Sequence, residues 1–95
     1  MPGKKKPPGK KKAVALKYKA GEQAAPVVAA KGAGEMAERI IKIATEHGIP
    51  VREDPDLLEA LSKLDINEEI PVELYQVIAE VLAWVYRINK SYPGN

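Results

Sequence analysis

The sequence predicts a small α/β domain, in which a mixed sheet of about three strands is packed by three helices. Short apolar segments with strand-like composition lie before and after one segment of helical periodicity. In the C-terminal half, apolar residues recur at helical spacing. A chain of 95 residues has room for one modest core, because a domain of this size buries only about 60% of its unfolded surface. We therefore expect one folded domain at residues 13–92, preceded by a disordered lysine-rich tail at residues 1–12.

Two segments near the N-terminus have the properties of strands. Residues 13–18, AVALKY, alternate their side chains and place Val14, Leu16 and Tyr18 on one face. Residues 27–31, VVAAK, are apolar without alternation, which predicts a strand covered on both faces. A polar connection, KAGEQAAP, separates the two.

A helix is predicted within residues 32–48, GAGEMAERIIKIATEHG. Its apolar residues recur three and four apart, and Gly48 stands where a helix ends in a left-handed residue. Residues 49–53, IPVRE, are short, β-branched and bounded by proline, and so predict a third strand. A strand, a helix and a strand in succession would form a right-handed parallel crossover.

The C-terminal half predicts two more helices. In residues 54–64, Asp54 can cap the first amides, Pro55 suits the first helical position, and the leucines form a stripe. Residues 71–90 form a longer helix that starts near Pro71, and its polar side chains occupy only a narrow strip. Such a helix is either buried over most of its circumference or offers part of its surface to a partner.

Charge is unevenly distributed along the chain. Residues 1–12 hold six of the fifteen basic residues and no acid, so the tail carries +6 and residues 13–95 carry −4. Nucleic-acid binders usually spread cations over a folded face, and this acidic body would repel phosphate weakly. A segment without apolar side chains is typical of a solvated, disordered tail.

The sequence offers little chemistry for catalysis or metal binding. It has no cysteine, and its only histidine, His47, stands at a predicted helix end, where the dipole favours a structural role. The glycines of GAG at residues 32–34 lack the lysine of a phosphate loop and indicate a tight turn. Trp84 has the spacing of a core residue, together with Tyr75, Val77 and Val81. We expect no enzyme activity, no catalytic residues, no metal site and no cofactor.

Four segments together resemble a known family. They are AVALKY, APVVAAKGAGEMAERIIKIATEHGIPV, EDPDLLEAL and EEIPVELYQVIAEVLAWVYR, and they run from Ala13 to Arg87. They are similar to the cytoplasmic C-terminal domain of the FlhB family, the switch proteins of the flagellar type III export apparatus. The resemblance implies a small mixed α/β domain, in agreement with the patterns above.

The chain departs from the family at the self-cleavage loop. Family members carry Asn-Pro-Thr-His before the AVALKY strand, whereas the corresponding residues here are Pro8, Gly9, Lys10 and Lys11. No asparagine occurs before Asn67, so the asparagine that would attack its own carbonyl is missing. We therefore expect no autocleavage. We also expect the lysines to stand where the cleavage loop and the tether to a membrane half would lie.

By resemblance, the function is that of a protein-interaction module in flagellar type III export, acting in substrate recognition or specificity switching. Its expected partners are export apparatus components and export substrates, and we expect a cytoplasmic monomer. The family's apolar docking patch carries over to Ala25, Pro26, Ala79 and Leu82. The helical period places Ala79 beside the polar strip and Leu82 nearer the core.

An alternative function is polyanion binding by the tail, without a specific nucleic-acid sequence. The tail could also approach the anionic inner face of the membrane, at about 1 kcal/mol per lysine. The residues that would make either contact are Lys4, Lys5, Lys6, Lys10, Lys11 and Lys12.

Overall fold

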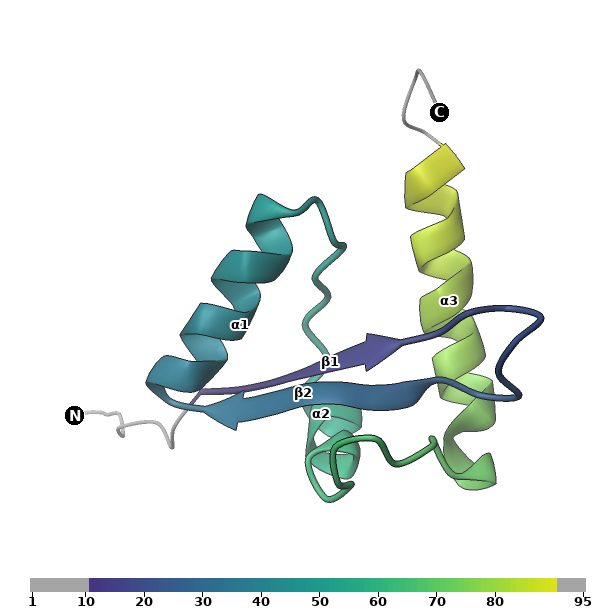
Figure 1. Cartoon of the computed structure of the whole chain (residues 1–95), viewed down its shortest axis with the longest axis horizontal. Helices are drawn as coiled ribbons and strands as arrows, with labels where there is room; N and C mark the ends of the chain where they lie inside the picture. The colour runs from purple at the N-terminus through teal and green to yellow at the C-terminus, as the bar shows by residue number, and fades with distance from the viewer. Residues whose placement is uncertain (1–10, 91–95) are drawn as a thin grey trace.

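The computed structural model describes residues 11–90 as a two-stranded sheet with helices on both faces (Figure 1). The α/β class and the three helices agree with the sequence prediction. The elements in order are β1 (Lys12–Lys17), β2 (Val27–Ala33), α1 (Glu35–Glu46), α2 (Pro55–Leu61), the 3-10 turn η2 (Val72–Leu74) and α3 (Tyr75–Lys90). Lys12, which was expected to end the tail, is the first residue of β1.

The two strands pair antiparallel across the predicted connection. Ala15 lies opposite Ala30 and Leu16 opposite Val28, with a register shift between the two pairs. In the connection, Gly21 has a positive φ of 89°, and the amide of Lys19 donates to Oε1 of Gln23 at 2.7 Å. The turn that returns the chain is therefore fixed by backbone and side-chain hydrogen bonds together.

The outer edge of β2 is partly covered by the segment before α3. The amide of Val28 donates to the carbonyl of Glu68 at 3.0 Å, and the carbonyl of Val28 accepts from the amide of Asn67 at 2.7 Å. A single bridge also joins Val27 to Glu69. These bonds satisfy the edge groups of β2 and hold residues 67–70 beside the sheet.

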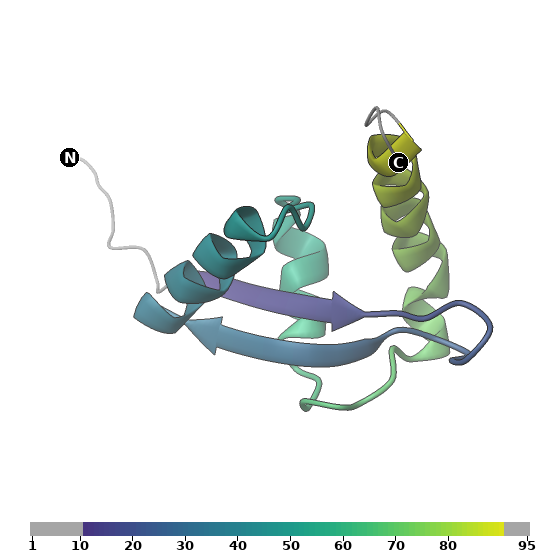
Figure 2. The same ribbon diagram turned by 45° about the horizontal axis from the view of Figure 1, so that its top comes forward.

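Helix α1 packs closely on one face of the sheet and contacts both strands (Figure 2). Gly32 of β2 permits this approach, because a Cβ there would lie 3.2 Å from Cδ1 of Ile40 and would meet the side chain of Met36. Ala37 on the same helix is fully buried. At its end, Gly48 adopts a positive φ of 72°, as the sequence predicted for a helix terminator.

The third strand expected at residues 49–53 does not form. These residues lead from α1 to α2 without regular structure, and the side chains of Ile49 and Val51 are 55% and 45% exposed. Strand formation needs an edge to pair with, and in the described part of the chain this segment pairs with neither strand. The expected parallel crossover is therefore wrong, and the sheet is antiparallel.

Helix α2 begins and ends as its sequence predicts. Oδ1 of Asp54 accepts from the amide of Leu57 at 3.1 Å, and Pro55 occupies the first helical turn. Beyond its last turn, Nζ of Lys31 donates to the carbonyls of Leu64 at 2.6 Å and Ser62 at 3.4 Å. A lysine from β2 therefore satisfies carbonyls that the end of α2 leaves unpaired.

The core lies on the face of the sheet opposite α1. It is centred on Leu61, Ile70 and Ile78, each at most 5% exposed. Val14 and Leu16 of β1 and Leu82 of α3 are among the partly buried side chains packed against it. Tyr75, predicted to be core, is instead 44% exposed at the first residue of α3.

Candidate docking groove

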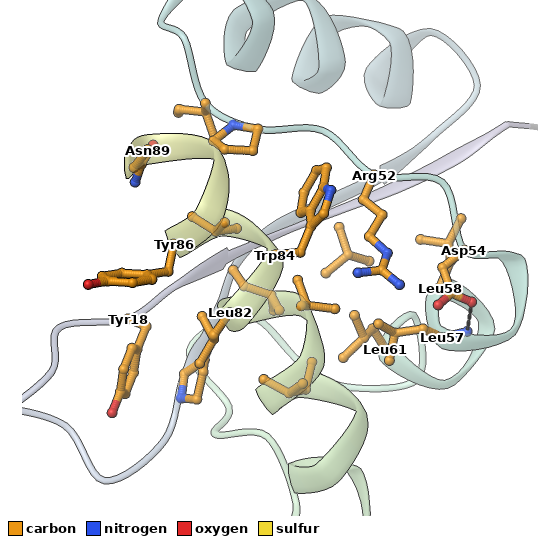
Figure 3. Close-up of a pocket in the computed structure, with 18 residues that line it drawn as sticks. Tyr18, Arg52, Asp54, Leu57, Leu58, Leu61, Leu82, Trp84, Tyr86 and Asn89 are labelled. Carbon is orange, nitrogen blue, oxygen red and sulfur yellow. Dashed lines mark hydrogen bonds between the residues drawn. The ribbon is translucent and has the colours of Figure 1, made fainter. Parts of the chain in front are cut away.

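An open groove of about 550 Å³ lies between α3, β1 and the irregular segment that connects α1 to α2 (Figure 3). Most of its lining is apolar. The residues that line it are Val14, Leu16, Tyr18, Pro26, Ile49, Pro50, Arg52, Asp54, Leu57, Leu58, Leu61, Ile78, Val81, Leu82, Trp84, Val85, Tyr86 and Asn89. Its volume falls within the usual range of about 300 to 1,000 Å³ for ligand pockets.

The groove exists because α3 leaves the core as it runs toward its C-terminus. Ile78, in the first half, is 2% exposed and belongs to the core cluster. Trp84 and Val85, in the second half, are only partly buried, and Tyr86 is 63% exposed. The apolar stripe of α3 therefore packs in the core at its N-terminal end and lines the open groove at its C-terminal end.

Arg52 places a positive charge in this apolar surround. Its guanidinium carbon lies 5.6 Å from the centroid of the Trp84 ring, which is within the range of a cation–π interaction. Figure 3 shows the two side chains next to one another, with Asp54 beyond the guanidinium and the rings of Tyr18 and Tyr86 toward the other end. Asp54 is engaged as the cap of α2.

The structure brings together only two of the four residues expected to form a docking patch. Pro26, which is buried, and Leu82, which is half-buried, both line the groove. Ala25 is 2% exposed and belongs to the core, whereas Ala79 is exposed on α3; neither lines the groove. The periodicity of α3 had placed Leu82 nearer the core than Ala79, and the observed burial agrees.

The lysine tail falls mostly outside the described residues, which begin at Lys11. The described part of the chain therefore excludes four of the expected contact residues, Lys4, Lys5, Lys6 and Lys10. Lys11 and Lys12 are exposed, and Nζ of Lys12 lies 3.7 Å from Oε1 of Glu59 on α2. A surface pair of this kind contributes little to stability.

The tight turn predicted at residues 32–34 is shorter than expected, because Gly32 and Ala33 belong to β2 and Gly34 alone forms the turn before α1. His47 is exposed at the end of α1, where its Nδ1 lies 2.9 Å from the carbonyl oxygen of Ile43. Gly34 adopts a positive φ of 65° directly before α1, and its amide donates to the carbonyl of Lys11 at 2.7 Å. That hydrogen bond closes the end of the sheet.

Within residues 11–90, no three histidine or carboxylate side chains are grouped so that they could hold a metal ion. The described residues also include no helix long and apolar enough to cross a membrane. The described residues of the groove provide apolar contact area and one positively charged side chain, Arg52, which stacks on Trp84. Its arrangement supports recognition of another molecule.

Sequence reasoning missed Arg52, Tyr18 and Tyr86 as groove residues. Arg52 had been assigned to a strand, and Trp84 to the core. One signal pointed toward the groove: the narrow polar strip on residues 71–90 left open a helix that offers part of its surface to a partner. In the structure, Ile78 is the buried residue in the first half of α3, and Trp84 and Val85 in the second half are only partly buried.

Comparison with known proteins gives the context of this groove. Residues 10–85 match the model of the FlhB HrpN YscU SpaS family. The flagellar biosynthetic protein FlhB of Yersinia enterocolitica is 47% identical over 79 residues, which are 82% of this chain and 21% of that protein. The YlqH protein of Bacillus subtilis (strain 168) is 40% identical over 81 residues, which are 85% of this chain and 87% of that protein. The chain thus spans about a fifth of the FlhB protein but most of YlqH.

Solved structures show the same fold. The PscU C-terminal domain has a TM-score of 0.73 and 37% identity, covering 78% of this chain and 95% of that chain. A mutated EscU/SpaS C-terminal domain has a TM-score of 0.78 and 31% identity, covering 81% of this chain and 96% of that chain. The family match over most of the chain, with two relatives in sequence and two in structure, places it: the chain belongs to the FlhB HrpN YscU SpaS family.

Proposed function

We propose that this protein is a protein-interaction module of the flagellar type III export apparatus. In this role it binds export substrates or apparatus components in the cytoplasm through the groove and takes part in substrate recognition or specificity switching. The observation that carries the proposal is the overlap of two features. The groove is an apolar concavity beside α3, and it contains Pro26 and Leu82, which the family resemblance had selected independently.

The physical work of such a module is contact between surfaces. Tyr86 and Ile49 line the groove and are 63% and 55% exposed, so they leave apolar surface that a partner can cover. Burying exposed apolar area releases about 25 cal/mol per Å², so a partner that covers these side chains gains affinity from them. Ala79, which is small and exposed, would allow the partner to approach α3 closely at one border.

The proposal is tested by adding a charge at that border. Ala79→Asp places a carboxylate on an exposed helical position, so the fold should survive while docking of an apolar segment fails. The measurement is pull-down of purified flagellar export substrates by the tagged full chain, with circular dichroism as the check of folding. Thr45→Asp, exposed on α1, is the matched control. Equal capture by Ala79→Asp and the unmodified chain would overturn the docking proposal.

We also propose that the chain acts without autocleavage. Pro8, Gly9, Lys10 and Lys11 supply no side chain that could repeat the attack by asparagine. Intact mass measurement after prolonged incubation in neutral buffer should give the 10.4 kDa polypeptide unchanged. A fragment that begins between residues 9 and 13 would contradict this part of the proposal.

The same pull-down separates the docking function from polyanion binding by the tail. Replacing Lys4, Lys5, Lys6 and Lys10 by glutamine removes four charges from residues 1–10. A docking module keeps its capture of export substrates after this change. A polyanion binder loses its salt-sensitive affinity.

A further inference from the structure

Among the described residues that line the groove, Arg52 is the one cationic side chain. It lies in the irregular segment between α1 and α2, so its position depends on side-chain contacts more than on regular backbone structure. Stacking against the Trp84 ring at 5.6 Å supplies such a contact and orients the planar guanidinium. The groove therefore presents a charge that is held in a defined place.

The N–H donors of Arg52 are not paired with Asp54, the carboxylate that lines the same groove. Asp54 lines the same groove, but its Oδ1 accepts from the amide of Leu57 at 3.1 Å. In the described part of the chain, no ion pair within 4.0 Å joins Arg52 to Asp54. A guanidinium stacked through its face keeps its edge donors available for a planar acceptor such as a carboxylate.

We propose that the groove selects a segment of a partner protein in which an acidic side chain stands next to large apolar residues. The apolar residues fill the space between α3 and the segment at Ile49 and Pro50, and the carboxylate meets Arg52. A single negative charge suits this site, because one arginine faces it and Asp54 lies nearby. This inference rests on the proposed docking function and adds the chemistry of the docked segment.

The test begins with a displayed library of random twelve-residue peptides, selected against the full chain. Peptides that bind in the groove are identified by testing them against Leu82→Ala. Their affinity should fall for this variant, because Leu82 lines the groove wall. We expect this set to be enriched in aspartate or glutamate flanked by large apolar residues. Groove-binding peptides with no acidic enrichment would overturn the inference and leave the docking function standing.

Charge reversal then tests the role of Arg52 directly. The best peptide and its glutamate-to-glutamine and glutamate-to-lysine versions are titrated by fluorescence polarisation. Loss of a charge-assisted hydrogen bond predicts binding to Arg52→Glu on the order of tenfold weaker or more. The lysine peptide should prefer Arg52→Glu over the unmodified chain. If Arg52→Glu and the unmodified chain rank the three peptides in the same order, Arg52 does not read the charge.

Two controls separate charge reading from a general effect of charge or folding. Arg39→Glu changes the same charge on the exposed face of α1 and should leave all three affinities unchanged. Arg52→Gln keeps the side chain polar and should abolish the preference for glutamate over glutamine while the protein unfolds at the same temperature. If no library peptide responds to Leu82→Ala, the groove takes no peptide, and the docking function itself fails along with the inference.

Discussion

Helices α1 and α3 are both amphipathic, yet they meet the rest of the molecule in different ways. Along α1, the fully buried Ala37 and the close approach over Gly32 bring the helix down onto both strands. Along α3, only Ile78 is fully enclosed, and the second half carries Trp84, Val85 and Tyr86 along an open groove. The difference teaches that an apolar helical stripe becomes core only along the part of its length that other elements cover.

The side chains at the two contacts explain the difference. Under α1, Gly32 leaves no space for a side chain, and Ala37 of the helix is fully buried, whereas Met36 and Ile43 on the same helix stay about half exposed. The Trp84 ring of α3 lies against Arg52 in the segment at residues 49–52, which forms no strand and stays partly exposed. In Figure 1 the two helices rise from the same sheet with the connection to α2 between them. We infer that α1 mainly stabilises the fold and that the second half of α3 mainly provides contact surface.

The largest effect on stability should come from the buried half of α3. Ile78→Ala removes a side chain that is 2% exposed in the core cluster and should lower the free energy of unfolding by about 3 kcal/mol. Tyr86→Ala, two turns later at 63% exposed, should lower it by only about 0.5 kcal/mol. Urea unfolding of both variants measures the contrast. Equal losses would show that the two halves of α3 do not differ as described.

The next effect concerns the close contact under α1. Gly32→Val adds a branched side chain where even a Cβ would meet Met36 and Ile40, so we expect a loss of about 2 kcal/mol. Gly21 provides the contrast, because no atom lies within 4 Å of a Cβ placed there. Gly21→Ala meets only its positive φ of 89°, and should destabilise by about 1 kcal/mol. A harmless valine at Gly32 would mean that α1 sits further from the sheet.

The smallest effect concerns the cap of α2. Asp54→Ala removes the acceptor for the amide of Leu57 and should lower the free energy of unfolding by about 1 kcal/mol. Asp56→Ala, in the same first turn, changes only the interaction with the helix dipole, for which about 0.3 kcal/mol is expected. Thermal unfolding of the pair measures the difference. If the two losses were equal, the charge near the helix start would matter and the capping bond would not.

The features predicted correctly from the sequence are those that depend on neighbours in the chain. Asp54 and Pro55 correctly predicted the start of α2, and Gly48 the end of α1. Capping and left-handed residues affect only the backbone within one helical turn, so a short stretch of sequence is enough to identify them. The strand predicted at residues 49–53 failed for the opposite reason. Its β-branched composition is favourable, but a strand needs an unpaired edge within reach, and that is decided by the whole fold.

The groove, like the missing strand, depends on the whole fold and could not be fully predicted from neighbouring residues in the sequence. Pro26 and Leu82 were selected by resemblance to a family, and the structure places both in the groove. Arg52 and Tyr86 become groove residues only because α3 diverges from the core and the segment after α1 stays irregular. No local pattern encodes that separation. Ala25, selected in the same way as Pro26, is instead enclosed in the core.

Hydrogen–deuterium exchange on the full chain, with and without a saturating flagellar export substrate, tests the contrast between the two helices most directly. The account predicts slower amide exchange at residues 49–54 and 79–89 when the substrate is bound, and unchanged exchange along α1. Slower exchange confined to α1, or no change at residues 79–89 in a complex that demonstrably forms, would contradict the assignment of the second half of α3 as the docking surface.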